Sequence, residues 1–148
     1  MSSPGTQIAE ALGLLLLRSN RARLYGRLTA GLDPSVDSAT YPVISGLART
    51  GSMSSARLAA EVGIDRSVVS RHASRLARDG LVKRVRDPAD GRAMLLVLTV
   101  RGRLTVQRMR RRLAAALDEH LSLWPPGEAR RFATDLKRFV GQGLSRLT

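Results

Sequence analysis

The feature that most constrains the fold is a pair of short predicted helices joined by a very short turn. Ser54 or Ser55 can cap the first helix, which ends at Gly63. Asp65 can cap the second helix, which ends at Gly80. Two short helices joined by a tight, glycine-containing turn are typical of a helix-turn-helix motif.

A β-hairpin is predicted directly after the second helix. The segments 81–86 and 92–98 have the composition of strands, and Asp87–Gly91 between them has that of a turn. The hairpin has a basic first strand and a polar tip. It therefore predicts a wing beside the helix-turn-helix.

Further helices are predicted on both sides of this unit. One long helix is expected over 7–32, a shorter helix over 39–50, and another long helix over 100–123. Pro125 and Pro126 separate the last of these from a C-terminal helix. The predicted fold class is mainly α with a small β-hairpin wing (α+β), in which a winged helix-turn-helix is inserted between helices.

The charge balance indicates a polyanionic partner. The chain has 148 residues, with 25 Lys and Arg against 12 Asp and Glu, which gives a formal net charge of +13. An excess of this size says nothing about the fold, but it favours binding to nucleic acid.

Other classes of protein find no support in the sequence. It contains no cysteine, which excludes disulfides, thiolate zinc sites and cysteine nucleophiles and fits a reducing cytoplasm. The two histidines, His72 and His120, belong to no metal-spaced cluster, and there is no phosphate-binding glycine loop. The apolar run 8–17 is shorter than the roughly 20 residues that span a bilayer. We therefore expect a cytoplasmic protein that is not an enzyme and has no cofactor or metal.

The second helix of the motif, predicted over 66–79, has one apolar face and one basic face. At about 100° per residue, Val69, Ala73 and Leu76 share the inward side. The other side carries small hydroxyls, which let the backbone approach a major groove, and arginines, which can pair with guanine. A solvated basic surface is the alternative interpretation. The predicted DNA contacts are Arg66, Ser67, Val68, Ser70, Arg71, Ser74, Arg75 and Arg78.

The hairpin supplies a second group of candidates. A basic tip suits a minor groove, because the negative potential of that groove attracts arginine. The alternative is that Asp90 and Arg92 only stabilise the turn. The predicted DNA contacts of the wing are Lys83, Arg84, Arg86, Asp90, Gly91 and Arg92.

Together these residues resemble the MarR family of bacterial winged-helix transcriptional regulators. The resemblance covers nearly the whole chain, although His72 and Ala73 stand where larger aliphatic residues are expected. In the helices it rests on Leu58-Ala59, Val62-Gly63-Ile64, the run from Asp65 to Arg71, Leu76 and Gly80-Leu81-Val82. Its most specific part is the hairpin with Arg84, Asp87-Pro88, Asp90-Gly91-Arg92, and Leu98-Thr99 followed by Gly102.

The resemblance implies a repressor that binds double-stranded DNA. Arg92 would enter the minor groove, and Asp90 would brace the wing through an arginine such as Arg84. The family also implies relief of repression by a small lipophilic or phenolic effector, bound between the dimerisation helices and the DNA-reading unit. No motif marks the residues of that ligand site.

A homodimer is expected from the terminal helices. Their apolar faces are larger than one small winged-helix unit could cover, and a two-fold dimer would read an inverted repeat. We expect one MarR-type domain over 1–148, with a helical dimerisation part at 7–50 and 100–148 and a DNA-reading part at 51–99. The predicted interface residues are Ile8, Leu12, Leu15, Phe132, Leu136, Phe139, Val140 and Leu147.

Two other functions compete with this prediction. A sequence-indifferent architectural or RNA-binding protein would be served equally well by a charge of +13, but it would not need the patterned outer face of the second helix. An interaction module that no longer reads DNA is the other alternative, and the presence of Arg71 and Arg92 argues against it.

Overall fold

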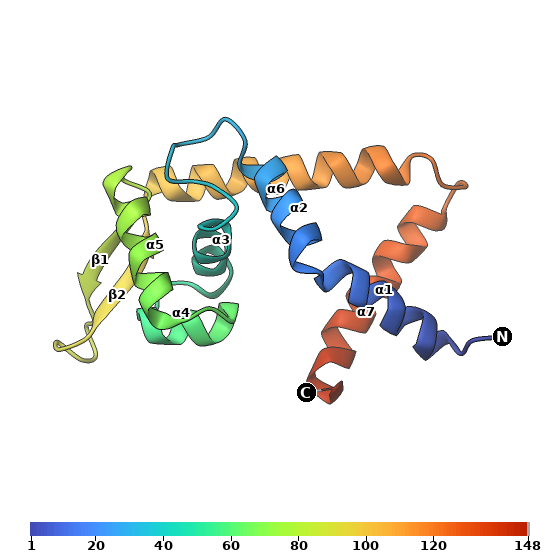
Figure 1. Cartoon of the computed structure of the whole chain (residues 1–148), viewed down its shortest axis with the longest axis horizontal. Coiled ribbons are helices and arrows are strands. Elements are labelled where there is room, and N and C mark those ends of the chain that lie inside the picture. Colours follow the sequence, from blue (N-terminus) through green and yellow to red (C-terminus); the bar gives the residue numbers. More distant parts are fainter. Residues whose placement is uncertain (148) are drawn as a thin grey trace. The chain divides into compact units, whose positions relative to one another are not determined.

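The computed structural model describes the backbone of residues 1–147 and the side chains of residues 1–143. The chain forms two compact units, Met1–Arg110 and Arg111–Thr148, each described separately below. The elements are α1 (Pro4–Leu16), α2 (Arg18–Thr29), α3 (Tyr41–Thr50), α4 (Ser55–Val62), α5 (Arg66–Arg78), β1 (Val82–Arg86), β2 (Met94–Leu98), α6 (Val100–Leu121) and α7 (Glu128–Leu147), as Figure 1 shows. The predicted fold class is confirmed, since helices dominate and the two strands form a wing after a helix-turn-helix.

The expectation of one continuous helix over 7–32 is wrong. The backbone turns to an extended conformation at Leu17, with φ −54° and ψ 130°, and this residue separates α1 from α2. The side-chain amide of Asn20 donates to the carbonyl oxygen of Leu14 at 2.7 Å, which satisfies an acceptor at the end of α1. An asparagine side chain can replace a backbone hydrogen bond in this way. The spacing of apolar residues, from which one helix was predicted, carries no information about such a bond.

The helix-turn-helix forms where it was predicted, with one difference in capping. Ser54 Oγ accepts a hydrogen bond from the N–H of Arg57 at 3.3 Å and so caps α4. Gly63 takes the left-handed conformation, with φ +68°, that ends α4 and admits the tight turn. Asp65 stands at the N-cap position of α5, but its exposed side chain makes no capping hydrogen bond. Burial of the inner face of α5 stabilises this helix instead.

The strands of the hairpin are slightly shorter than predicted. β1 and β2 are antiparallel, with Val82 opposite Leu98 and Arg86 opposite Met94. A single bridge joins Met53, in the loop after α3, to Leu96, so the hairpin is tied to the segment before α4. The hairpin therefore extends from the same core that holds the helix-turn-helix.

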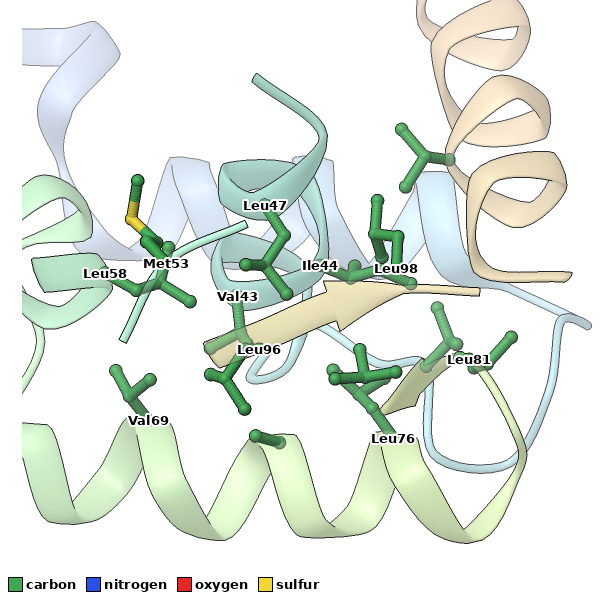
Figure 2. Packing of buried hydrophobic residues seen from close by; sticks show 14 of the residues in the cluster. Val43, Ile44, Leu47, Met53, Leu58, Val69, Leu76, Leu81, Leu96 and Leu98 are labelled. Carbon is green, nitrogen blue, oxygen red and sulfur yellow. The ribbon is translucent and has the colours of Figure 1, made fainter. Parts of the chain in front are cut away.

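The core of the first unit is formed by apolar side chains from α3, α4, α5, the hairpin and the start of α6. Val69 and Leu76 of α5 point toward Leu96 of β2 and toward α3, as Figure 2 shows, and all three side chains are at most 1% exposed. Ile44 contributes from α3. This packing fixes which face of α5 points away from the core.

The junction between β2 and α6 explains part of the sequence motif at 98–102. Thr99 donates its N–H to the carbonyl oxygen of Leu81 at 3.1 Å, and its hydroxyl accepts from the N–H of Gly102 at 3.0 Å. A Cβ at Gly102 would lie only 2.0 Å from the Leu81 oxygen. Glycine is therefore required at 102 because the first turn of α6 lies directly against the backbone at the base of the hairpin.

The second unit holds the end of α6 and α7. Helix α6 ends at Leu121, two residues before the predicted end. The ring of Trp124 lies 5.2 Å from that of Phe132 and 6.3 Å from that of His120, measured between ring centroids. Gly127, with φ +86°, completes the turn into α7.

No helix within the described residues combines the length and the apolar character that crossing a membrane requires.

Candidate nucleic-acid interface

Helix α5 presents an outward face that is set by the core on its other side. Val69, Ala73 and Leu76 are fully buried, as the sequence pattern predicted. Arg66, Ser67, Arg71 and Arg78 are exposed. The other candidates on this helix, Val68, Ser70, Ser74 and Arg75, are partly buried.

The guanidinium groups of three arginines on α5 form no ion pair with a described residue. Among the described residues, Arg66, Arg71 and Arg78 take part in no ion pair. Their side chains extend from a helix whose outward face bears no acidic residue before Asp79. This face can therefore offer positive charge and donor groups to an anionic partner.

Arg84 of β1 connects the wing to α5. Its guanidinium donates to the carbonyl oxygen of Ser70 at 3.1 Å and to the hydroxyl of Ser74 at 3.2 Å. The implied pairing of Arg84 with Asp90 is therefore wrong for this chain. The two residues lie on different parts of the hairpin, and Arg84 is in register with Leu96 at its middle.

The tip of the wing is held by its own backbone and carboxylates. Asp87 Oδ1 accepts from the N–H of Ala89 at 2.9 Å, and Asp90 Oδ1 accepts from the N–H of Arg92 at 3.1 Å. These bonds are the turn chemistry expected of aspartate. The other predicted wing residues, Lys83, Arg86, Gly91 and Arg92, are exposed.

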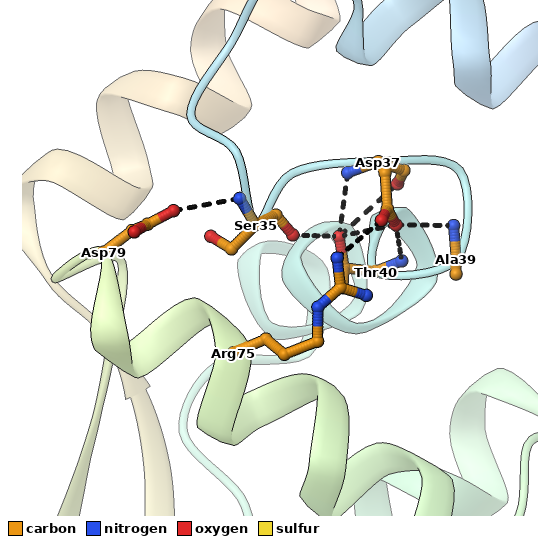
Figure 3. Close-up of polar contacts among 6 residues, drawn as sticks. All are labelled: Ser35, Asp37, Ala39, Thr40, Arg75 and Asp79. Atoms are coloured by element: carbon orange, nitrogen blue, oxygen red, sulfur yellow. Dashed lines mark hydrogen bonds and ion pairs between the residues drawn. The ribbon is translucent and has the colours of Figure 1, made fainter.

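Arg75 differs from the other arginines of α5. Its guanidinium donates to Asp37 Oδ2 at 2.7 Å and so joins α5 to the loop before α3 (Figure 3). Burial alone would raise the pKa of Asp37. The hydrogen bond and attraction from Arg75, with the N–H groups of Thr40 and Ala39, outweigh burial and lower that pKa below its ordinary value.

Sequence reasoning did not find Asp37 as a partner of Arg75 on α5. Thirty-eight positions separate it from Arg75, and no periodicity relates residues so far apart. Asp37 stands in the Asp-Ser-Ala-Thr run just before α3, where an aspartate indicates only a local turn.

His72 lies on the partly buried side of α5. Its Nδ1 is buried without a hydrogen-bond partner among the described residues. Burial, and then the positive charges of Arg75 and Arg71, lower the pKa of His72, and the carboxylate of Asp37 offsets this only in part. The imidazole is therefore neutral at neutral pH and adds no charge to the outward face.

The predicted dimer residues lie on exposed apolar surface within their own units. Helix α1 has no buried residue, and Ile8 and Leu15 are exposed while Leu12 is partly buried. On α7, Phe132, Leu136 and Val140 are each between 45% and 49% exposed, and Phe139 is partly buried. The side chain of Leu147 lies outside the described residues.

The described part of the chain contains no group of three or more His, Cys, Asp or Glu side chains placed to hold a metal ion.

Part of the chain matches the sequence model of a known family. Residues 31–93, which run from the end of the first helical segment into the wing, match the sequence model of the MarR family. No curated protein matches the chain.

Solved structures share the fold over almost the whole length. A MarR transcriptional regulator from Methanosarcina mazei Go1 is 21% identical with a TM-score of 0.71, over 95% of this chain and 98% of that one. Wild-type MarR from E. coli in its apo form is 20% identical with a TM-score of 0.71, over 93% and 96%. The PcaV transcriptional regulator from Streptomyces coelicolor, in complex with its natural ligand, is 27% identical with a TM-score of 0.57, over 96% and 99%.

Proposed function

We propose that the protein is a MarR-type, sequence-specific DNA-binding transcriptional regulator that represses its target as a homodimer on an inverted-repeat operator. Two observations support this: residues 31–93 match the sequence model of the MarR family, and the fold is shared over nearly the whole chain. In this proposal, residues 7–50 and 100–148 form the dimerisation part and residues 51–99 form the DNA-reading part. Two copies of one reading helix related by a two-fold axis would contact two half-sites of opposite direction.

The observation that carries this proposal is the outward face of α5. The exposed guanidinium of Arg71 follows the small side chains of Ser67 and Ser70 along this face. Small residues let the helix backbone approach a major groove, and an unpaired guanidinium can donate two hydrogen bonds to guanine O6 and N7. A sequence-indifferent binder would need the charge but not this arrangement.

The wing supports the proposal as a second contact. Lys83, Arg86 and Arg92 are exposed along one short hairpin, and its turn is stabilised by Asp87 and Asp90. Arg92 is exposed in the turn at the tip, after Asp90 and Gly91, and in this proposal it enters a minor groove. The negative potential of a narrow minor groove attracts arginine without a requirement for a particular base.

Arg71 and Arg92 are expected to make different contributions to binding. Arg71→Ala is expected to weaken binding to the operator by about 1–3 kcal/mol and to relax the base preference at one position per half-site. Arg92→Ala is expected to weaken binding to operator and random duplex more evenly and to flatten the salt dependence. The measurement is a salt titration of each variant on the duplex that the wild type selects from a random library and on unselected duplex.

A matched control removes the same charge elsewhere. Arg131→Ala, on an exposed position of α7, should leave the ratio of operator to random-duplex affinity unchanged. All three variants should keep the wild-type melting temperature, because these side chains are exposed. If Arg71→Ala weakens both duplexes equally, Arg71 contacts phosphate and the proposed reading face is wrong. A wild type that prefers no sequence would favour the architectural or RNA-binding alternative.

We also propose that a small effector binds beside α3, β2 and α6. A hollow of about 290 Å³ lies there, with Leu47, Leu98 and Val106 among its apolar lining and with Arg103 and Arg110 at its polar side. Phenolic acids titrated into the protein–operator complex are expected to release the DNA. Arg110→Ala should weaken this effect by removing one positive charge, and equal release from that variant would argue against this hollow.

A further inference from the structure

The loop that connects α2 to α3 contacts the recognition helix α5 at two points. Arg75 of α5 binds Asp37, and Asp79 at the C-cap of α5 binds the backbone of Ser35, as Figure 3 shows. Arg75 and Asp79 are four residues apart, which places them one helical turn apart. Both contacts join the second half of α5 to one short stretch of loop.

The carboxylate of Asp37 uses its two oxygens for two different tasks. Oδ1 accepts from the N–H groups of Ala39 and Thr40, each at 2.9 Å, and so fixes the turn before α3. Oδ2 accepts from Arg75 at 2.7 Å. Because its other oxygen is held by backbone, Asp37 presents a fixed acceptor to α5.

The loop itself is well anchored to the rest of its unit. Thr40 is fully buried, and its hydroxyl donates to the carbonyl oxygen of Ser35 at 2.7 Å. Val36 is buried in the core, and Asp33 pairs with Arg101 of α6. An arginine attached to this loop is therefore attached to a fixed part of the molecule.

A second contact joins α5 to the same loop. Asp79 Oδ2 accepts from the N–H of Ser35 at 2.9 Å. The Ser35 hydroxyl and then this N–H lower the pKa of Asp79, although only the N–H makes a hydrogen bond of ordinary geometry. The carboxylate of Asp37 on the loop and that of Asp79 at the end of α5 thus join the same two elements.

We propose that the Asp37–Arg75 ion pair holds the recognition helix at a fixed position against the α2–α3 loop, and that Arg75 is a positioning residue and not a DNA contact. The proposal rests on the proposed function, since it assumes that α5 reads DNA. It separates Arg75 from Arg66, Arg71 and Arg78, whose guanidinium groups form no ion pair with a described residue. Arg75 was predicted from the sequence to contact DNA, and its charge is instead matched by Asp37.

The first test needs no DNA. Asp37→Asn keeps an oxygen for the turn before α3 but removes the charge that faces Arg75, and Arg75→Met keeps the aliphatic stem. Each is expected to speed hydrogen exchange in the second half of α5 by about two- to fivefold, the equivalent of one half-exposed ion pair. The double variant should exchange no faster than either single variant. Asp33→Asn is the matched control, because it makes the same charge change in the same loop but faces Arg101.

The second test measures DNA binding by these variants. A helix that is no longer held must be ordered on binding, so operator affinity should fall by the same factor of about two to five. The slope of affinity against salt should not change in Arg75→Met. A phosphate contact would instead lower that slope by about 0.9 for each copy of Arg75.

Each outcome decides the proposal. Unchanged exchange in Asp37→Asn and Arg75→Met, or the same change in Asp33→Asn, shows that the ion pair does not position α5. A reduced salt slope in Arg75→Met, or tighter operator binding by Asp37→Asn, shows that Arg75 contacts DNA. A wild type without sequence preference contradicts the proposed function only, because hydrogen exchange still tests the positioning of α5.

Discussion

Gly102→Ala is expected to lower the free energy of unfolding by about 2 kcal/mol or more, which corresponds to a melting temperature lower by about 4–8 °C or more. The new Cβ would lie 2.0 Å from the carbonyl oxygen of Leu81 and 3.1 Å from the Leu98 side chain. The oxygen belongs to the backbone and already accepts from the N–H of Thr99, so it cannot move without displacing the base of the hairpin. The gain in helix propensity, at most about 1 kcal/mol, offsets only part of this cost.

A second glycine provides the matched control for this measurement. Gly26 lies inside α2, and a Cβ there would meet no atom within 4 Å. Gly26→Ala should therefore stabilise the protein by about 0.5–1 kcal/mol, since alanine loses less backbone entropy in a helix. Thermal and urea unfolding of both variants would check the prediction. Equal melting temperatures for Gly102→Ala and the wild type would show that α6 and the hairpin are not in close contact.

Leu136→Asp is expected to convert the proposed homodimer into a monomer and to lower operator affinity by about a hundredfold or more, because two linked half-site contacts become one. Leu136 lies with Phe132 and Val140 on one exposed apolar stripe of α7. A charge in the middle of that stripe would be buried without a partner in a dimer, whereas it remains in water in a monomer. The helix should stay folded, since Leu136 is 46% exposed within a single chain.

Sedimentation equilibrium at low micromolar concentration, with a DNA titration, tests this prediction. The wild type should sediment at twice the chain mass of 16.1 kDa, and Leu136→Asp at that mass. Thr134→Asp introduces the same side chain on the opposite side of α7 and should remain a dimer that binds DNA. If the Leu136→Asp variant remains a dimer, the dimer interface does not include this stripe. A monomeric wild type would remove the basis for an inverted repeat.

Much of the fold could be predicted from local features of the sequence. Ser54, Gly63 and Gly80 act within a few residues of themselves, by capping a helix or by taking a left-handed backbone conformation. The inward side of α5 follows from a spacing of three or four residues, and Val69 and Leu76 are buried as that spacing requires. Turn chemistry located the tip of the wing in the same way. These effects depend on neighbours along the chain, so the chain order reveals them.

The candidate site was predictable only as a set of residue types. The basic character of α5 and of the wing is visible in the sequence, but it does not tell which arginines have partners. Arg84 is bound to Ser70 and Ser74 of α5, although the resemblance implied that Asp90 would brace the wing through an arginine such as Arg84. Arg75 is bound to Asp37 from a separate element. Neither the residue type nor the helical periodicity distinguishes an arginine that forms an ion pair from one that does not.

The sequence by itself determined the order of the helices, the helix-turn-helix, the wing and the direction of the apolar face of α5. Only the tertiary structure decided that Leu17 interrupts the first helical segment, that Gly102 must lack a side chain and that Arg75 binds Asp37. The first group depends on capping, turn conformation and periodicity, which act over a few residues. The second depends on side chains and carbonyl groups that come within hydrogen-bond or contact distance only after packing, as Asp37 and Arg75 do at 2.7 Å across 38 positions of the chain.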